Sequence, residues 1–146
     1  MVLRIEALRE RLAKLEEVVS RLSELARVSR EEFERDYRQQ WLAERGLELA
    51  AQAVLDIGNH ILAGHFGESA QDYEDILVRL GRQRVFSAVL VARLKGLGGF
   101  RNILVHGYLS INSDKVYEAL QKGPADFTDF EAEILTWLDD TVREGG

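Results

Sequence analysis

The stretch ALRERLAKLEEVVSRLSELAR, residues 7–27, decides the fold class. Its apolar residues recur at steps of three and four, which places them on one face of an α-helix. We predict a helix over residues 2–27. A helix with one apolar face must bury that face against other elements. The residues of this face are Leu8, Leu12, Leu15, Val19, Leu22 and Ala26.

The same spacing predicts further helices along the chain. We expect them over residues 30–63, 72–80, 85–106 and 112–122, with a last helix near the C-terminus. Ser29 with Glu32, and Thr128 with Glu131, match the capping box that starts a helix. Gly64 is expected to end the second helix, with Gly67 just beyond it, and Gly123 with Pro124 to end the fifth. No long segment alternates with the period of two that a strand requires. The sequence therefore predicts an all-α, up-and-down bundle formed by residues 1–146 as one domain, with Trp41 and Trp137 in its core.

Composition narrows the class of protein. The chain has 146 residues, 46% of them hydrophobic and 30% charged, as in soluble globular proteins. It contains no cysteine, which excludes disulfides, thiolate metal sites and thiol nucleophiles and suits the reducing cytoplasm. Nothing in the sequence matches a signal peptide or a membrane span.

The charge is unevenly distributed. The net charge is −6, yet residues 76–113 contain no Asp or Glu and six of the 19 Lys and Arg residues. The rest of the chain therefore carries 13 − 25 = −12. The basic block is either an anion-binding site or a set of cations that pair with acidic neighbours in the fold.

The string RNILVHGY, residues 101–108, closes this block and follows a glycine-rich segment. A guanidinium such as that of Arg101 can hold a phosphate with two parallel hydrogen bonds. An imidazole such as that of His106 can move a proton near neutral pH. Together they suffice for RNA cleavage in which the 2′-hydroxyl attacks the neighbouring phosphorus.

This string is similar to the R-x4-H-x-Y motif of HepT proteins, a branch of the HEPN superfamily. The preceding LKGLGGF, residues 94–100, resembles the family's approach to the motif, and AQAVLDIGNHILA, residues 51–63, resembles its second helix. The resemblance implies a HEPN bundle of four or five helices and a homodimer whose two motifs face each other across a cleft.

The resemblance also implies a function. HepT proteins are ribonuclease toxins that cleave RNA without a metal or cofactor, and an MntA-type nucleotidyltransferase blocks them by transferring AMP to the motif tyrosine, here Tyr108. Arg101 and His106 are then the catalytic residues, with Asn102 in support. We expect Arg93 and Lys95 to contact RNA.

Each of these residues could instead have a purely structural role. Arg101 could form an ion pair, His106 or Asn102 could cap a helix or a turn, and Tyr108 could be a core or interface aromatic. Asp56 and His60 share a helical face and could form an ordinary pair, support the site or ligate a metal, although no third ligand is apparent.

Two other functions remain open. Some HEPN proteins are non-catalytic binding or regulatory partners of nucleotidyltransferases. A plain dimeric helical scaffold is the third possibility, but it would leave the acid-free basic block unexplained.

Overall fold

The computed structural model describes residues 3–145, and in this range every regular element is helical. This confirms the all-α prediction. The elements are α1 (Ile5–Leu25), α2 (Arg30–Arg35), α3 (Tyr37–Ile61), the π-helical turn η1 (Leu62–Phe66), α4 (Tyr73–Arg82), α5 (Ala88–Leu94), α6 (Leu97–His106) and α7 (Ser113–Arg143).

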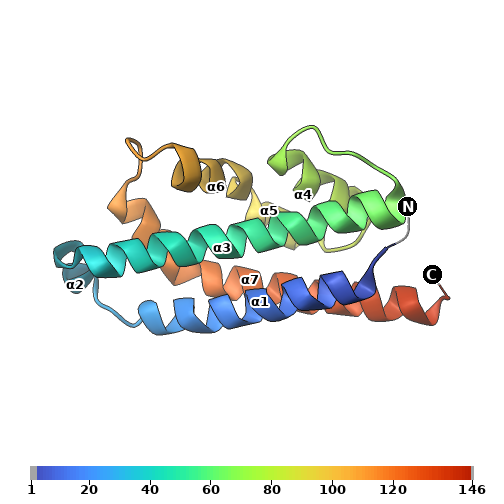
Figure 1. Cartoon of the computed structure of the whole chain (residues 1–146), viewed down its shortest axis with the longest axis horizontal. Helices are drawn as coiled ribbons and strands as arrows, with labels where there is room; N and C mark the ends of the chain where they lie inside the picture. The colour runs from blue at the N-terminus through green and yellow to red at the C-terminus, as the bar shows by residue number, and fades with distance from the viewer. Residues whose placement is uncertain (1–2, 146) are drawn as a thin grey trace.

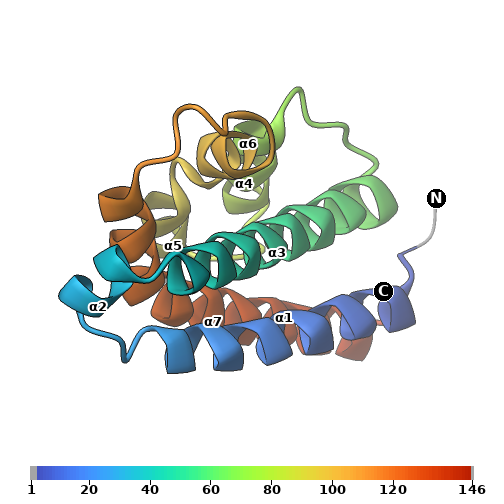
Figure 2. The same cartoon turned by 60° about the vertical axis from the view of Figure 1, so that its left-hand side comes forward.

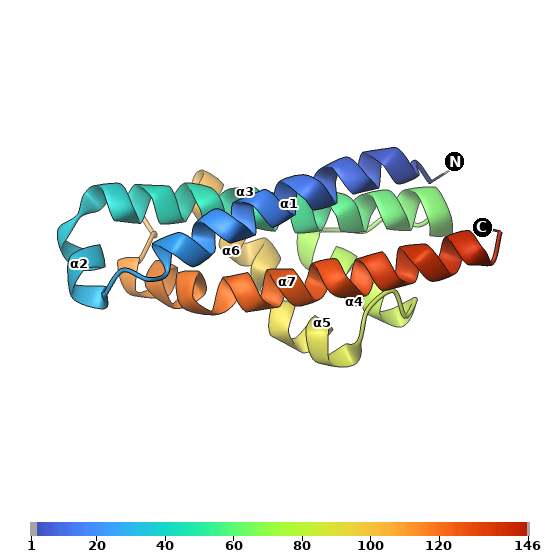
Figure 3. The same cartoon turned by 90° about the horizontal axis from the view of Figure 1, so that it is seen from below.

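Helix α3 lies at the centre of the arrangement. It contacts α1 and α7 on one side, and α4 and α6 on the other, as Figure 1 shows. The turned view in Figure 2 keeps α4 and α6 together on that second side. From below, α5 lies beside α7, which it also contacts (Figure 3). No helix of the described chain is long and apolar enough to cross a membrane.

The core consists of the apolar faces that the sequence pattern predicts. Leu8, Leu15 and Leu22 of α1 are fully buried, and so are Ala51 and Val54 of α3. Among the described residues no polar or charged side chain falls in the buried class. Burial of apolar surface is therefore what holds these helices together.

The predicted second helix is divided in two. Asp36 is extended, and its side chain accepts a hydrogen bond from the backbone N–H of Arg38, which caps α3. Gln40 donates to the carbonyl groups of Phe33 and Glu34 at the end of α2. These side chains satisfy the backbone groups that the corner leaves free, and so they stabilise the break. The Ser29 cap at the start of α2 is confirmed.

The far end of this predicted helix is also different. The helical backbone continues past Gly64 through η1 and ends at Gly67, which has a left-handed φ of 64°. A glycine in this conformation is the usual helix stop. The prediction that this helix ends at Gly64 is therefore wrong.

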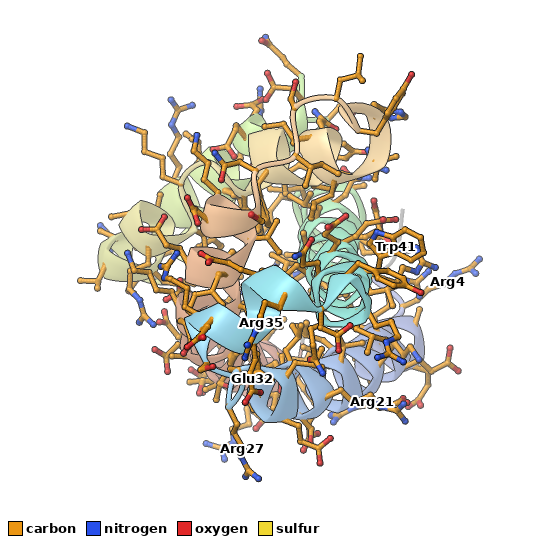
Figure 4. The ribbon with its side chains drawn as sticks, turned by 90° about the vertical axis from the view of Figure 1, so that its left-hand side faces the viewer. Arg4, Arg21, Arg27, Glu32, Arg35 and Trp41 are labelled. Carbon is orange, nitrogen blue, oxygen red and sulfur yellow. The ribbon has the colours of Figure 1, made fainter. Side chains whose placement is uncertain are left out.

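The prediction that Trp41 is a core residue is wrong. Its side chain is 65% exposed and packs edge-on against Tyr37, one turn away. Figure 4 shows Trp41 pointing outward from α3. Trp137 is partly buried and packs against the core.

The predicted break at Gly123 and Pro124 is absent, because both residues lie inside the single helix α7. A proline inside a helix costs about 3 kcal/mol. An uninterrupted apolar stripe offsets this cost and runs the length of the helix: Val116, Leu120, Gly123, Phe127, Phe130, Ile134 and Leu138. Thr128 and Glu131 consequently lie mid-helix and cap nothing. Burial and the neighbouring Glu16 raise the pKa of Glu131 to about 7.

The helix predicted over residues 85–106 is two helices, α5 and α6. Ser87 caps α5. The chain then turns at Gly96, whose φ of +91° is a conformation that side chains rarely adopt. The turn lets α6 lie across α3 and α4.

Gly98 allows α6 to approach α4 closely. A Cβ atom added there would lie 2.7 Å from the Tyr73 Cβ and 3.1 Å from the backbone nitrogen of Glu74. The Glu74 carboxylate accepts hydrogen bonds from the backbone N–H groups of Gly96 and Gly98, at 3.1 and 2.7 Å. Glu74 therefore caps α6 from a neighbouring helix.

We expect Gly98→Ala to lower the free energy of unfolding by about 1–3 kcal/mol, because neither a Cβ nor a backbone atom can move aside cheaply. Gly99→Ala is the matched control. A Cβ at Gly99 meets nothing within 4 Å, so this change should stabilise the helix by up to about 1 kcal/mol. Urea unfolding of both variants measures the difference. Equal effects would show that the close approach does not limit stability.

Candidate active site

Arg101 projects from α6 toward α3 and α4. Its Nε donates to Oε1 of Gln52 at 2.8 Å, and its Nη1 donates to Oδ1 of Asn102 at 3.1 Å. Its Cζ lies 4.9 Å from the centroid of the Tyr73 ring, a cation–π contact. Gln52 is oriented in turn, since its Nε2 donates to Oδ1 of Asp56 at 2.7 Å. Three helices thus fix the guanidinium in place.

The side chains that hydrogen-bond to Arg101 or stack on it are uncharged. None of the ion pairs among the described residues includes it. The alternative that Arg101 is a structural ion pair is therefore not supported within the chain. These hydrogen bonds use two of the five N–H groups of an arginine, and the other three have no acceptor among the described residues.

His106 is the last residue of α6 and is exposed. Five helical steps of about 100° place it about 140° around the helix from Arg101 and about 7.5 Å further along the axis. The two predicted catalytic side chains therefore leave α6 on different faces. No hydrogen bond joins the two side chains in the described part of the chain.

Tyr108 lies in the turn after α6 and is 77% exposed. The turn is closed by a hydrogen bond from the Ser110 N–H to the Gly107 carbonyl. Gly107 itself has an ordinary φ of −97°, but a Cβ there would lie 3.1 Å from the Ile103 carbonyl oxygen. The phenol is consequently open to a large partner, and it is not the core aromatic of the alternative interpretation.

Two other cations of the basic block form ion pairs within the fold. Arg93 pairs with Asp126 and Asp129 of α7, and these hydrogen bonds raise its pKa. Arg79 pairs with Glu68 and Asp75. The explanation that the cations pair with acidic neighbours therefore applies to Arg79 and Arg93.

Lys95, by contrast, is exposed and takes part in none of the ion pairs found in residues 3–145. It lies at the C-terminal end of α5, next to the turn into α6.

Asp56 does not pair with His60. Its Oδ1 accepts a hydrogen bond from Gln52, and Gln52 in turn accepts one from Arg101. No group of three potential metal ligands occurs among the described residues. Sequence reasoning missed Gln52 and Tyr73, because the contacts that matter join residues 49 and 28 positions apart in the sequence.

Residues 8–134 match the family described as Ribonuclease HepT-like. The tRNA nuclease HepT of Aphanizomenon flos-aquae is 27% identical over 129 residues, which cover 88% of this chain and 87% of that protein. The mRNA nuclease HepT of Shewanella oneidensis is 30% identical over 99 residues, which cover 68% and 74%.

Solved structures agree with these relatives. The tri-AMPylated HEPN toxin of Shewanella oneidensis, solved in complex with an MNT antitoxin, has a TM-score of 0.79 at 26% identity and covers 88% of this chain and 96% of that one. YutE of Bacillus subtilis has a TM-score of 0.80 at 22% identity over 97% and 95% of the two chains, a likeness of fold alone. The helical arrangement is thus the HEPN arrangement expected from the sequence.

Proposed function

Because this chain belongs to the Ribonuclease HepT-like family, we propose that it is an endoribonuclease toxin with Arg101 and His106 as its catalytic residues. One observation carries the assignment. A partly buried guanidinium is held by neutral groups only and keeps its charge for an anion. Such a preoriented cation stabilises the charge that develops on a phosphate during cleavage.

The active site requires two copies of the chain. Arg101 and His106 leave α6 on different faces, so a two-fold axis near α6 is the simplest way to bring an imidazole to the guanidinium. The dimer then holds two such sites, each with Arg101 of one copy and His106 of the other. Lys95 extends the positive charge toward the flanking phosphates, and Arg93 would join it only by exchanging its carboxylates for phosphate.

The reaction needs no metal or cofactor in this proposal. One imidazole accepts the proton of the 2′-hydroxyl, whose oxygen forms a bond to the adjacent phosphorus. The bond from phosphorus to the 5′-oxygen breaks, and the imidazolium formed in the first step returns its proton to that oxygen, directly or through a water molecule. The products are a 2′,3′-cyclic phosphate and a 5′-hydroxyl. Asn102 supports Arg101 through its hydrogen bond.

We expect His106→Ala to slow RNA cleavage by roughly a hundredfold or more, the range that a general acid or base contributes. Arg101→Lys should slow it by about tenfold or more, since an ammonium cannot reproduce the planar fork. The measurement is gel analysis of RNA cleaved in excess chelator. His65→Ala is the control, because His65 lies in η1, where it packs on Phe66 and Trp137 and takes no part in the contacts of Arg101. Loss of wild-type activity in chelator would contradict the metal-free mechanism.

A mixing experiment tests the composite site. Arg101→Ala and His106→Ala homodimers should each be inactive, whereas subunit exchange between them should restore up to about a quarter of the wild-type rate. After random exchange, half of the dimers would contain one subunit of each variant. In each of these dimers, one of the two sites would hold both an intact Arg101 and an intact His106. No recovery after verified exchange would place both residues of a site in one copy.

The proposal extends to control by a nucleotidyltransferase. The Shewanella oneidensis relative is described as tri-AMPylated and in complex with an MNT antitoxin. In this chain the exposed Tyr108 hydroxyl follows His106 by two residues. An AMP group joined there brings a phosphodiester anion that competes with RNA for Arg101, and a nucleoside that blocks the cleft.

Co-expression with an MntA-type nucleotidyltransferase should therefore add AMP to the wild type and not to Tyr108→Phe. Intact-mass analysis detects the added mass, and the variant should keep its ribonuclease activity. Tyr37→Phe is the matched control, since that hydroxyl is also exposed but lies on α3. Inhibition of the wild type with unchanged mass would show that complex formation alone restrains the enzyme.

A further inference from the structure

A pocket of about 480 Å³ lies beside Arg101, where α3, α4 and α6 meet. Its volume is within the range of small-molecule sites. The polar side chains that line it are Asp56, Asn59, Asp72, Tyr73 and Asn102. Asn59, Asp72 and Asn102 are exposed, so the pocket opens to solvent and a ligand can enter it.

The pocket is continuous with the phosphate-binding group. Asn102 accepts a hydrogen bond from Arg101, and Tyr73 lies under the same guanidinium. Both side chains also line the pocket. A phosphate held by Arg101 would thus sit at its rim, with the attached nucleoside directed over it.

The lining excludes a second phosphate. No lysine or arginine lines the pocket, and the carboxylates of Asp56 and Asp72 repel anions. Leu55 and Ile76 are buried and give it an apolar floor. An uncharged planar ring with polar edges, such as a nucleobase, suits this combination.

The carboxylates further specify which base fits. Oδ1 of Asp56 accepts from Gln52, and Oδ1 of Asp72 accepts from the backbone N–H of Asp75. In each case the second oxygen has no hydrogen-bond donor among the described residues. These oxygens are free to accept hydrogen bonds from a ligand.

We propose that this pocket binds the nucleobase next to the scissile phosphate and selects a base with an exocyclic amino group: cytosine, adenine or guanine. The inference rests on the proposed function, because it is Arg101 that places the nucleotide. An amino group donates to the free carboxylate oxygens, whereas uracil presents carbonyl oxygens in its place. A uracil in the pocket does not make this hydrogen bond to a charged acceptor, which corresponds to a preference of roughly five- to tenfold.

Cytosine and uracil give the sharpest comparison, since they are alike in size and differ in one amino group. The probes are 2′-O-methyl trinucleotides of cytidine and of uridine, which cannot be cleaved by 2′-hydroxyl attack. We expect the full-length protein to bind the cytidine probe about five- to tenfold more tightly in a fluorescence titration.

Two variants test the lining. Asp72→Ser keeps an oxygen that can cap α4 and removes the carboxylate, so the fold should be retained. Asn59→Ala changes an exposed side chain on the pocket wall. Both should reduce the preference, the first to less than about twofold. The matched control is Asp36→Ser, the same change at the cap of α3, outside the pocket, which should leave the preference intact.

Equal dissociation constants for the two probes with the wild type would overturn the proposal. So would a cytosine preference that survives in both Asp72→Ser and Asn59→Ala. Binding does not require cleavage, so the two proposals fail separately. If the chain prefers cytosine but cleaves no RNA, the ribonuclease proposal is overturned and the pocket proposal is retained. If it cleaves RNA without any base preference, the pocket proposal is overturned and the ribonuclease proposal is retained.

Discussion

The Glu74 carboxylate holds the N-terminus of α6 against α4 by accepting hydrogen bonds from the amides of Gly96 and Gly98. The arrangement of the candidate site depends on this contact. It fixes where α6 begins, and therefore where Arg101 meets Gln52 on α3. The glycines that are costly for a helix are thus needed at its start, Gly96 for its left-handed turn and Gly98 for the close approach.

Charge is the second organising feature. An acidic chain with a net charge of −6 can host an anion site only where a cation is kept from its carboxylates. Arg79 and Arg93 are paired within the fold, whereas Arg101 is surrounded by amides and an aromatic ring. The carboxylate nearest to it in this network, Asp56, acts through Gln52. Asp56 therefore orients the arginine without forming an ion pair with it.

The long helices show how tertiary packing overrides local signals. Pro124 is a strong local signal for a helix end, yet α7 passes through it, because an apolar stripe on both sides of the proline is buried against the neighbouring helices. At Asp36 the apolar pattern predicted a continuous helix, whereas the chain turns a corner there. Its extended backbone and its cap on Arg38 start a new helix. The spacing of apolar residues therefore predicts which face of a helix is buried, but it does not predict where the helix ends.

The sequence by itself determined the helical class, the buried face of α1, the basic block and the R-x4-H-x-Y string, since each depends on residues close together along the chain. It also predicted two copies of the motif in one site, through a resemblance. Only the tertiary structure decided which cations of the block are paired, that Gln52 and Tyr73 hold Arg101, and that a polar pocket adjoins it. The contacts of Arg101 with Gln52 and Tyr73 join residues 28 or more positions apart, and no local periodicity specifies which distant side chains the packed helices bring together.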